Sequence, residues 1–159
     1  MGARVTEFDD SIRVEADRRL RRSNVKTMPY PGFPTDMQPQ IAVCMALAEG
    51  TSLVTEGIYD NRFRYTAELN RMGASIQVES KTAVIDGVTQ LHGCEVRACD
   101  LRAGAAMVIA ALCAEGTTTI EDAHYIERGY EDIIGKFAAI GGKIRRIETF
   151  EGNSQDAAG

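Results

Sequence analysis

Three arginines have a residue type and a position that could bind an anion. Arg62, Arg102 and Arg128 each stand where the sequence pattern predicts the first turn of a helix. A cation at this turn is unfavourable by about 0.3–1 kcal/mol, because the positive end of the helix dipole lies there. Free backbone N–H groups and guanidinium groups can together bind a phosphate or a carboxylate, which would explain the arginines. The structural alternative pairs each arginine with a nearby acid, such as Asp60 or Glu127.

Asp36 is the acidic residue expected to face these arginines. It follows segment 30–34, Tyr-Pro-Gly-Phe-Pro, which is stiffened by prolines and presents an aromatic side chain. Such a loop can fix a general acid–base group beside a substrate. A carboxylate at a helix N-terminus is also favourable for structural reasons, so Asp36 taken alone fits either role. Tyr59 lies close enough to Arg62 in the sequence to line a ligand pocket.

An internal repeat relates the acid to one of the arginines. Segment 48–51, Ala-Glu-Gly-Thr, recurs at 114–117, and the same offset of 66 residues places Arg102 on Asp36. Further upstream the offset is 71 residues, because the first copy has a longer proline-rich loop. We therefore infer two copies of one supersecondary unit.

The repeat describes one partial domain at 1–150. Its two units are about 1–79 and 80–150, and the small, polar segment 151–159 is expected to be a flexible tail. Because the first unit opens without the part that should precede it, we expect the chain to be a fragment of a larger protein.

Each unit is predicted to contain two short strands, a helix, a strand, a second helix and a closing strand. In the first unit, all but the closing strand are expected at 11–14, 24–27, 36–48, 52–55 and 61–73. Thr35 and Gln38 have the spacing of a capping box for the first of these helices. Asn61 and Gly73 are suitable N-cap and C-terminal residues for the second.

The first helix of the second unit is expected to be a central helix. Segment 101–114 is apolar all round after Arg102, which predicts burial on every side. Strands that surround buried helices indicate an α/β fold. Two units alone would leave part of such a helix uncovered, so more protein is expected around it.

Composition excludes several classes of function. A net charge of -5, with basic residues spread along the chain, argues against a nucleic-acid binder. No stretch of about 18 apolar residues predicts a membrane span, and the N-terminal segment does not have the pattern of an export signal. The cysteines form no CxxC pair and no metal-binding spacing, so we expect reduced, buried thiols and no metal; they are Cys44, Cys94, Cys99 and Cys113.

Five motifs carry a resemblance to a known family. They are Pro-Gly-Phe-Pro-Thr-Asp-Met-Gln at 31–38, Glu-Gly-Ile-Tyr-Asp-Asn-Arg-Phe at 56–63, Glu-Leu-Asn-Arg-Met-Gly-Ala at 68–74, Asp-Leu-Arg-Ala at 100–103 and Glu-Arg-Gly-Tyr-Glu at 127–131. Together they closely resemble UDP-N-acetylglucosamine 1-carboxyvinyltransferase, from about Gly2 to Ile147. The resemblance implies a cytoplasmic enzyme that moves the enolpyruvyl group of phosphoenolpyruvate to the 3′-hydroxyl of UDP-N-acetylglucosamine and releases phosphate. That reaction needs no cofactor and is the first committed step of peptidoglycan synthesis.

The resemblance also implies roles for individual residues. Asp36 corresponds to the general base, which takes the proton of the sugar hydroxyl. Arg102 and Arg128 correspond to the arginines that hold the phosphate and carboxylate of phosphoenolpyruvate. Further active-site positions are Arg62, Ile58 and Tyr59.

The implied fold is two inside-out α/β domains of three units each, with the active site between them. The two units found here would be the C-terminal part of such a protein. The family's N-terminal lysine and asparagine, and its loop with a reactive cysteine, would lie upstream. We therefore expect negligible turnover unless the missing N-terminal domain is supplied, because one wall of the cleft would be absent.

Two alternatives stay open at this point. The shikimate-pathway enolpyruvyl transferase shares the fold and reaction type, although the motifs at 31–38 and 60–63 favour the UDP-sugar enzyme. The chain could instead be a non-catalytic fragment that binds anions or a partner domain. This second alternative predicts the same arginines but no reaction when a complementing chain is supplied.

Overall fold

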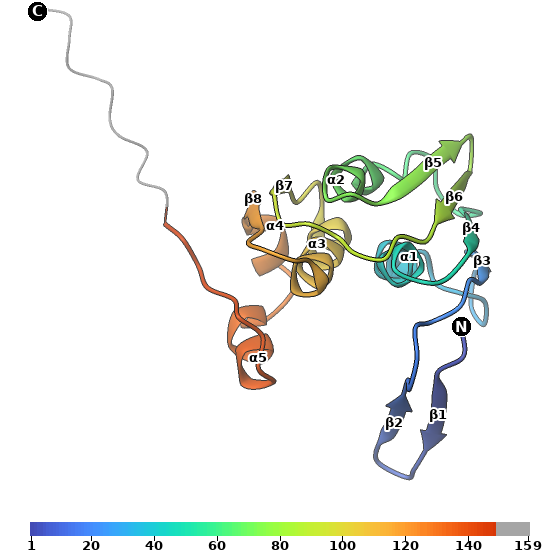
Figure 1. The fold of residues 1–159 in the computed structure, drawn as a ribbon, viewed down its shortest axis with the longest axis horizontal. Coiled ribbons are helices and arrows are strands. Elements are labelled where there is room, and N and C mark those ends of the chain that lie inside the picture. The colour runs from blue at the N-terminus through green and yellow to red at the C-terminus, as the bar shows by residue number, and fades with distance from the viewer. Residues whose placement is uncertain (149–159) are drawn as a thin grey trace, which may run out of the picture.

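A four-stranded mixed sheet forms one side of the chain (Figure 1). The computed structural model describes residues 1–148, so the predicted tail at 151–159 lies outside the described residues. The strand order is β3-β4-β6-β5, with β3 parallel to β4 and the other pairs antiparallel. The strands are β3 (Asn24–Lys26), β4 (Thr51–Thr55), β5 (Ser75–Glu79) and β6 (Thr82–Asp86). Alternation of buried and exposed residues along β4 and β6 places one face of this sheet against the core.

Two smaller strand pairs complete the β structure. β7 (Glu95–Arg97) is parallel to β8 (Thr119–Glu121), with Val96 opposite Ile120. The β3–β4 pair has Val25 opposite Val54. These two parallel registers are separated by the same offsets, 71 and 66 residues, that the sequence repeat gives.

A hairpin of β1 (Arg4–Glu7) and β2 (Ile12–Glu15) projects from the rest of the chain (Figure 1). Val5 lies opposite Val14 in this hairpin, and Ile12 has the same strand phase as Val14, so these three side chains share a face. All three are exposed to solvent.

Two helices pack side by side against the strands. They are α1 (Gln38–Ala46) and α3 (Leu101–Cys113). Small residues on both helices are fully buried in one core cluster, including Ala42, Ala46, Ala106 and Ala110. Small side chains permit a close approach of the two helices, and the core closes around them with methionine and leucine side chains from α1, α2 (Tyr65–Arg71) and α3.

The expectation of a helix buried on every side is correct only for the middle of α3. Residues 103–108 are buried, but Leu112 is 38% exposed and Cys113 is exposed in the last turn. The four cysteines are free, as expected, yet none belongs to the fully buried class, because three are half-buried and Cys113 faces solvent.

Two predicted helix starts are wrong. The helix predicted at 61–73 begins as α2 at Tyr65, because Asn61 takes a left-handed backbone conformation with φ 56°. The helix predicted at 36–48 begins as a 3₁₀ turn, η1 (Thr35–Met37), before α1. Neither η1 nor α1 has a side-chain cap, so the predicted capping box does not form.

Two short helices follow at the C-terminal side: α4 (His124–Glu127) and α5 (Ile133–Ala139). Ile126 of α4 packs with Ala98 and Val108 in a second, smaller core cluster. Among residues 1–148, every helix is too short or too polar to cross a membrane.

A close backbone approach at Gly87 gives the first testable prediction. A Cβ atom at Gly87 would lie 1.6 Å from the carbonyl oxygen of Ala48. Gly87→Ala is therefore expected to lower the free energy of unfolding by about 3 kcal/mol, measured by urea denaturation, because the packed backbone must move. Gly116→Ala is the matched control, since Gly116 has φ +92° but its nearest atom lies 3.9 Å from the added carbon. The control should lose only about 1 kcal/mol, and an equal loss in both variants would contradict the steric argument.

Candidate active site

A buried carboxylate organises the region that contains the predicted site residues. Glu56 directly follows β4 and is only 2% exposed. Its Oε1 atom accepts hydrogen bonds from the hydroxyl of Thr27 at 2.8 Å and from the backbone N–H groups of Ile58 and Tyr59 at 2.8 and 3.1 Å. Its Oε2 atom accepts from the Thr35 hydroxyl at 3.0 Å and from the Gln38 amide at 3.3 Å.

These hydrogen bonds keep the Glu56 carboxyl ionised despite its burial. Burial raises the pKa of this carboxyl, but the hydrogen bonds that it accepts outweigh burial, and the pKa lies below its ordinary value. They also explain why the predicted capping box fails. The side chains of Thr35 and Gln38 are directed to Glu56 and are not available to cap the helix.

The structure brings Asp36 and Arg102 together. Asp36 lies in η1, directly before α1, and Arg102 lies in the first turn of α3. The Arg102 Nε–H group donates to Asp36 Oδ1 in an ion pair. The expectation that this acid faces a repeat-related arginine is therefore confirmed. Both side chains remain accessible, with Asp36 65% and Arg102 33% exposed.

The N-terminus of α3 is built to present Arg102. Asp100 is the N-cap, and its Oδ1 atom accepts from the backbone N–H groups of Arg102 and Ala103 at 2.8 and 3.0 Å. The Asp100 carboxylate therefore satisfies the helix start and offsets the unfavourable dipole at Arg102. Its role is a cap, and the guanidinium group pairs with Asp36 instead.

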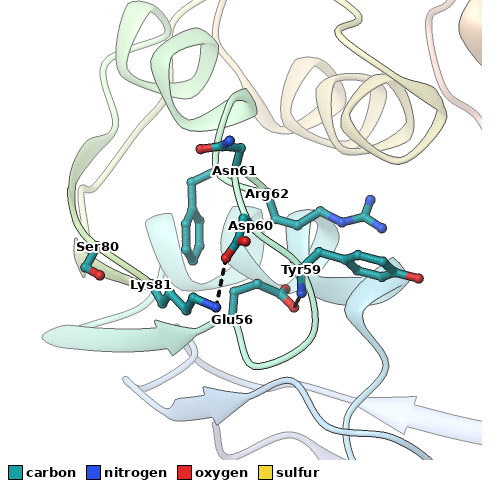
Figure 2. Close-up of a pocket in the computed structure, with 8 residues that line it drawn as sticks. Glu56, Tyr59, Asp60, Asn61, Arg62, Ser80 and Lys81 are labelled. Atoms are coloured by element: carbon teal, nitrogen blue, oxygen red, sulfur yellow. Dashed lines mark hydrogen bonds and ion pairs between the residues drawn. The ribbon is translucent and has the colours of Figure 1, made fainter.

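Arg62 lies in the loop before α2 and not at a helix start. Its guanidinium carbon is 4.4 Å from the centre of the Tyr59 ring, a cation–π contact (Figure 2). The suggested pairing of Arg62 with Asp60 is not found, because Asp60 Oδ1 lies 2.8 Å from Lys81 Nζ.

Arg128 is also not in a first helical turn. It is the C-cap of α4, where the negative end of the helix dipole favours a cation. The carboxylate of the preceding Glu127 pairs with Arg146 at 3.2 Å. Within residues 1–148, no hydrogen bond or ion pair joins Arg128 to Asp36 or Arg102.

A shallow pocket of about 240 Å³ lies beside the Tyr59–Arg62 contact (Figure 2). It is lined by Glu56, Tyr59, Asp60, Asn61, Arg62, Phe63, Ser80 and Lys81. Ile58, at the same loop, is 36% exposed and Tyr59 is 52% exposed. The predicted site residues thus form two groups, the Asp36–Arg102 pair and the 58–62 loop, and both are attached to Glu56.

Sequence reasoning missed Glu56. A signal was present, because Ser52, Val54 and Glu56 follow one another at every second residue and all three are buried. An acid on the buried phase of a strand must find donors, and here it finds them in two other segments of the chain. In the part of the chain that the structure describes, no group of three His, Cys, Asp or Glu side chains lies close enough to hold a metal ion.

Comparison with known proteins identifies the family. The sequence profile of the family described as EPSP synthase (3-phosphoshikimate 1-carboxyvinyltransferase) matches residues 1–137, which is most of the chain. The chain belongs to the EPSP synthase family. This family member is 54% identical over 147 residues to UDP-N-acetylglucosamine 1-carboxyvinyltransferase 3 from Caldanaerobacter subterraneus subsp. tengcongensis. The match covers 92% of this chain and confirms the resemblance that the motifs indicated.

Solved structures of the EPSP synthase family support the same fold. The enolpyruvyl transferase NikO from Streptomyces tendae superposes with a TM-score of 0.84 at 33% identity, covering 91% of this chain and 34% of that one. EPSP synthase from Acinetobacter baumannii gives a TM-score of 0.54 at 17% identity, covering 76% of this chain and 29% of that one, which shows the fold alone. The α/β fold is therefore confirmed.

The EPSP synthase family member described here spans only about a third of these related chains. It covers 35% of the length of the Caldanaerobacter relative. The predicted fragment character is consistent with this share.

The lowered pKa of Glu56 predicts that the stability of the chain depends on pH at this residue. The unfolded chain takes up the proton near pH 4.5, whereas the folded chain takes it up only at lower pH. The stabilisation is complete above about pH 4.5 and is lost as the pH falls through the folded pKa. Urea unfolding of the wild-type chain and of Glu56→Gln should therefore differ most at neutral pH, with a difference that narrows in acid. A difference that stays constant with pH would contradict this account.

Proposed function

We propose that this chain carries the general base and the phosphoenolpyruvate-binding arginines of a UDP-N-acetylglucosamine 1-carboxyvinyltransferase. The observation that carries the proposal is the ion pair of Asp36 with Arg102 at the starts of two neighbouring helices. An accessible carboxylate beside an accessible guanidinium group can take a proton from a hydroxyl while the arginine binds an anion. The identity to named members of the family supports this choice of substrates.

In the proposed reaction, Asp36 accepts the proton of the sugar 3′-hydroxyl as its oxygen bonds to C2 of phosphoenolpyruvate. C3 gains a proton in this addition and becomes a methyl group. The C2–O bond to phosphate then breaks, a methyl proton leaves, and the double bond of the enolpyruvyl group is restored. The phosphate or carboxylate of phosphoenolpyruvate competes with Asp36 for Arg102, which frees the Asp36 carboxylate to act as a base.

The other predicted site residues take supporting roles in this proposal. Arg128 binds phosphoenolpyruvate together with Arg102, although its side chain comes from the C-terminal end of α4. Arg62 is a further active-site arginine, held in its loop by the ring of Tyr59. Ile58 and Tyr59 lie beside the UDP-sugar, and their partial exposure supports a role in contact with a ligand.

The fold proposal is an inside-out α/β barrel with two repeated units in this chain. The equal registers of the β3–β4 and β7–β8 pairs support it, as do the paired helices α1 and α3. The remaining two thirds of the family's length, expected upstream as an N-terminal domain, would form the second wall of the cleft. The reaction would then serve peptidoglycan synthesis, cell shape and cell division in the cytoplasm.

A second candidate is a non-catalytic module that binds anions or a partner domain. The share of the relatives' length that the chain covers, 35%, favours this candidate for the chain when it acts alone. The two candidates differ in what happens when the missing part is supplied.

The decisive assay measures phosphate release from phosphoenolpyruvate and UDP-N-acetylglucosamine. We expect negligible release by the chain alone and clear release when the rest of a family member is added as a separate polypeptide. Asp36→Asn should lower the rate in the mixture by at least about 100-fold, because the amide cannot act as a base.

Asp86→Asn is the matched control for this assay, since Asp86 is an exposed acid at the end of β6 that accepts only from Thr51. It should keep the wild-type rate. A folded chain that binds the added portion but releases no phosphate would favour the non-catalytic module.

Arg102 provides a separate prediction about substrate binding. In the active mixture, Arg102→Ala should raise the KM for phosphoenolpyruvate by about 10–100-fold, the usual effect of removing a charge-assisted hydrogen bond. Arg97→Ala is the control, because Arg97 is an exposed arginine that pairs with Glu121 at 2.7 Å. If both variants keep the wild-type KM, Arg102 does not bind the anion.

A further inference from the structure

We propose that Glu56 is a positioning residue that sets the location of Asp36 relative to the loop of Ile58 and Tyr59. This inference rests on the proposed function, because its catalytic consequence requires that Asp36 and that loop act on one substrate. Glu56 has no direct contact with Asp36 among the hydrogen bonds of the described chain, so it acts through its neighbours.

The two oxygens of the Glu56 carboxylate serve two different segments. Oε2 accepts from Thr35, the residue before Asp36, and from Gln38, two residues after it. Oε1 accepts from the backbone N–H groups of Ile58 and Tyr59. One rigid, planar group of three heavy atoms therefore links the turn that presents Asp36 to the loop that presents Tyr59.

A third segment keeps the carboxylate in place. The Thr27 hydroxyl donates to Glu56 Oε1 and accepts from the backbone N–H of Gly57 at 2.8 Å. Gly57 is needed there because a Cβ atom at this residue would lie 2.5 Å from the Thr27 carbonyl oxygen. Since Thr27 is fully buried, the linkage has little freedom to shift.

The donors around Glu56 differ in what they tolerate, which makes the proposal testable. The backbone N–H groups of Ile58 and Tyr59 can only donate, so they require an oxygen at the Oε1 position. The Thr35 hydroxyl can reverse its direction, and the Gln38 amide can rotate to present its Oε1 atom, which is buried without a partner in the described chain. Glu56→Gln can therefore preserve the linkage with its NH₂ group on the Thr35 side, whereas Glu56→Leu removes it.

The experiment compares four variants of the full chain: Glu56→Leu, Glu56→Gln, Thr35→Val and Asn70→Ala. Thr35→Val cuts only the Asp36 side of the linkage and serves if Glu56→Leu does not fold. Asn70→Ala is the structural control, because the Asn70 side chain makes two backbone hydrogen bonds to Ile76 away from the site, at 2.8 and 3.0 Å. All assays are run below the unfolding transition of each variant.

The first measurement needs no substrate. Amide hydrogen exchange of Ile58 and Tyr59 should accelerate roughly tenfold in Glu56→Leu, about the effect of one lost hydrogen bond, and little in Glu56→Gln or Asn70→Ala. The Arg102 Nε–H resonance reports the ion pair with Asp36 and should shift in Glu56→Leu and Thr35→Val only. Unchanged exchange and an unchanged resonance in these two variants would overturn the proposal, whether or not the protein is an enzyme.

The second measurement is phosphate release in the mixture with the complementary portion. We expect kcat to fall by about 100-fold in Glu56→Leu, with rescue to within about tenfold of wild type in Glu56→Gln and no loss in Asn70→Ala. Equal losses in Glu56→Leu and Asn70→Ala would reduce Glu56 to a structural residue and overturn the proposal. If the wild-type mixture itself is silent, the proposed function fails, and the exchange and resonance data alone decide whether Glu56 positions the two segments.

Discussion

The burial of one carboxylate is the constraint on which the site region depends. An ionised group taken out of water costs several kcal/mol unless hydrogen-bond donors replace the solvent. For Glu56 the donors come from three segments that are far apart in the sequence, at Thr27, at 35–38 and at 58–59. Satisfying this charge therefore fixes the ends of β3 and β4, the turn before α1 and the loop before α2 at the same time. The sheet and helices bring these segments near one another, and the carboxylate sets their final arrangement.

The close packing of α1 and α3 has the same kind of effect at a larger scale. Because small side chains such as Ala42 and Ala106 are buried between these helices, their N-terminal ends lie close together and an acid on one can meet an arginine on the other. Asp36 and Arg102 stand at equivalent positions of the sequence repeat, so the pairing couples two related parts of the chain. The equal registers of the two parallel strand pairs place these helices in similar local settings.

Much of this arrangement could be predicted from local pattern and the repeat. The apolar segment of α3, the strand at 51–55 and the pairing of Asp36 with an arginine all follow from features that a single sequence displays. The start of α2 and the position of Arg128 could not be predicted in this way, because a left-handed Asn61 and a short α4 depend on tertiary contacts. The failed capping box has a clear cause: a buried acid at 56 competes for the Thr35 hydroxyl and wins, and propensity alone carries no information about such a distant partner.

The β1–β2 hairpin has a consequence for handling the chain as an isolated polypeptide. Its three exposed aliphatic side chains, Val5, Ile12 and Val14, form an oily strip along a two-stranded ribbon. Both outer edges of such a ribbon offer unpaired N–H and C=O groups, and an apolar strip beside open edges is a template for sticking to other molecules. The colloidal behaviour of the polypeptide, including its tendency to form soluble clusters at high concentration, is therefore set mainly by these few residues and only weakly by its net charge of -5.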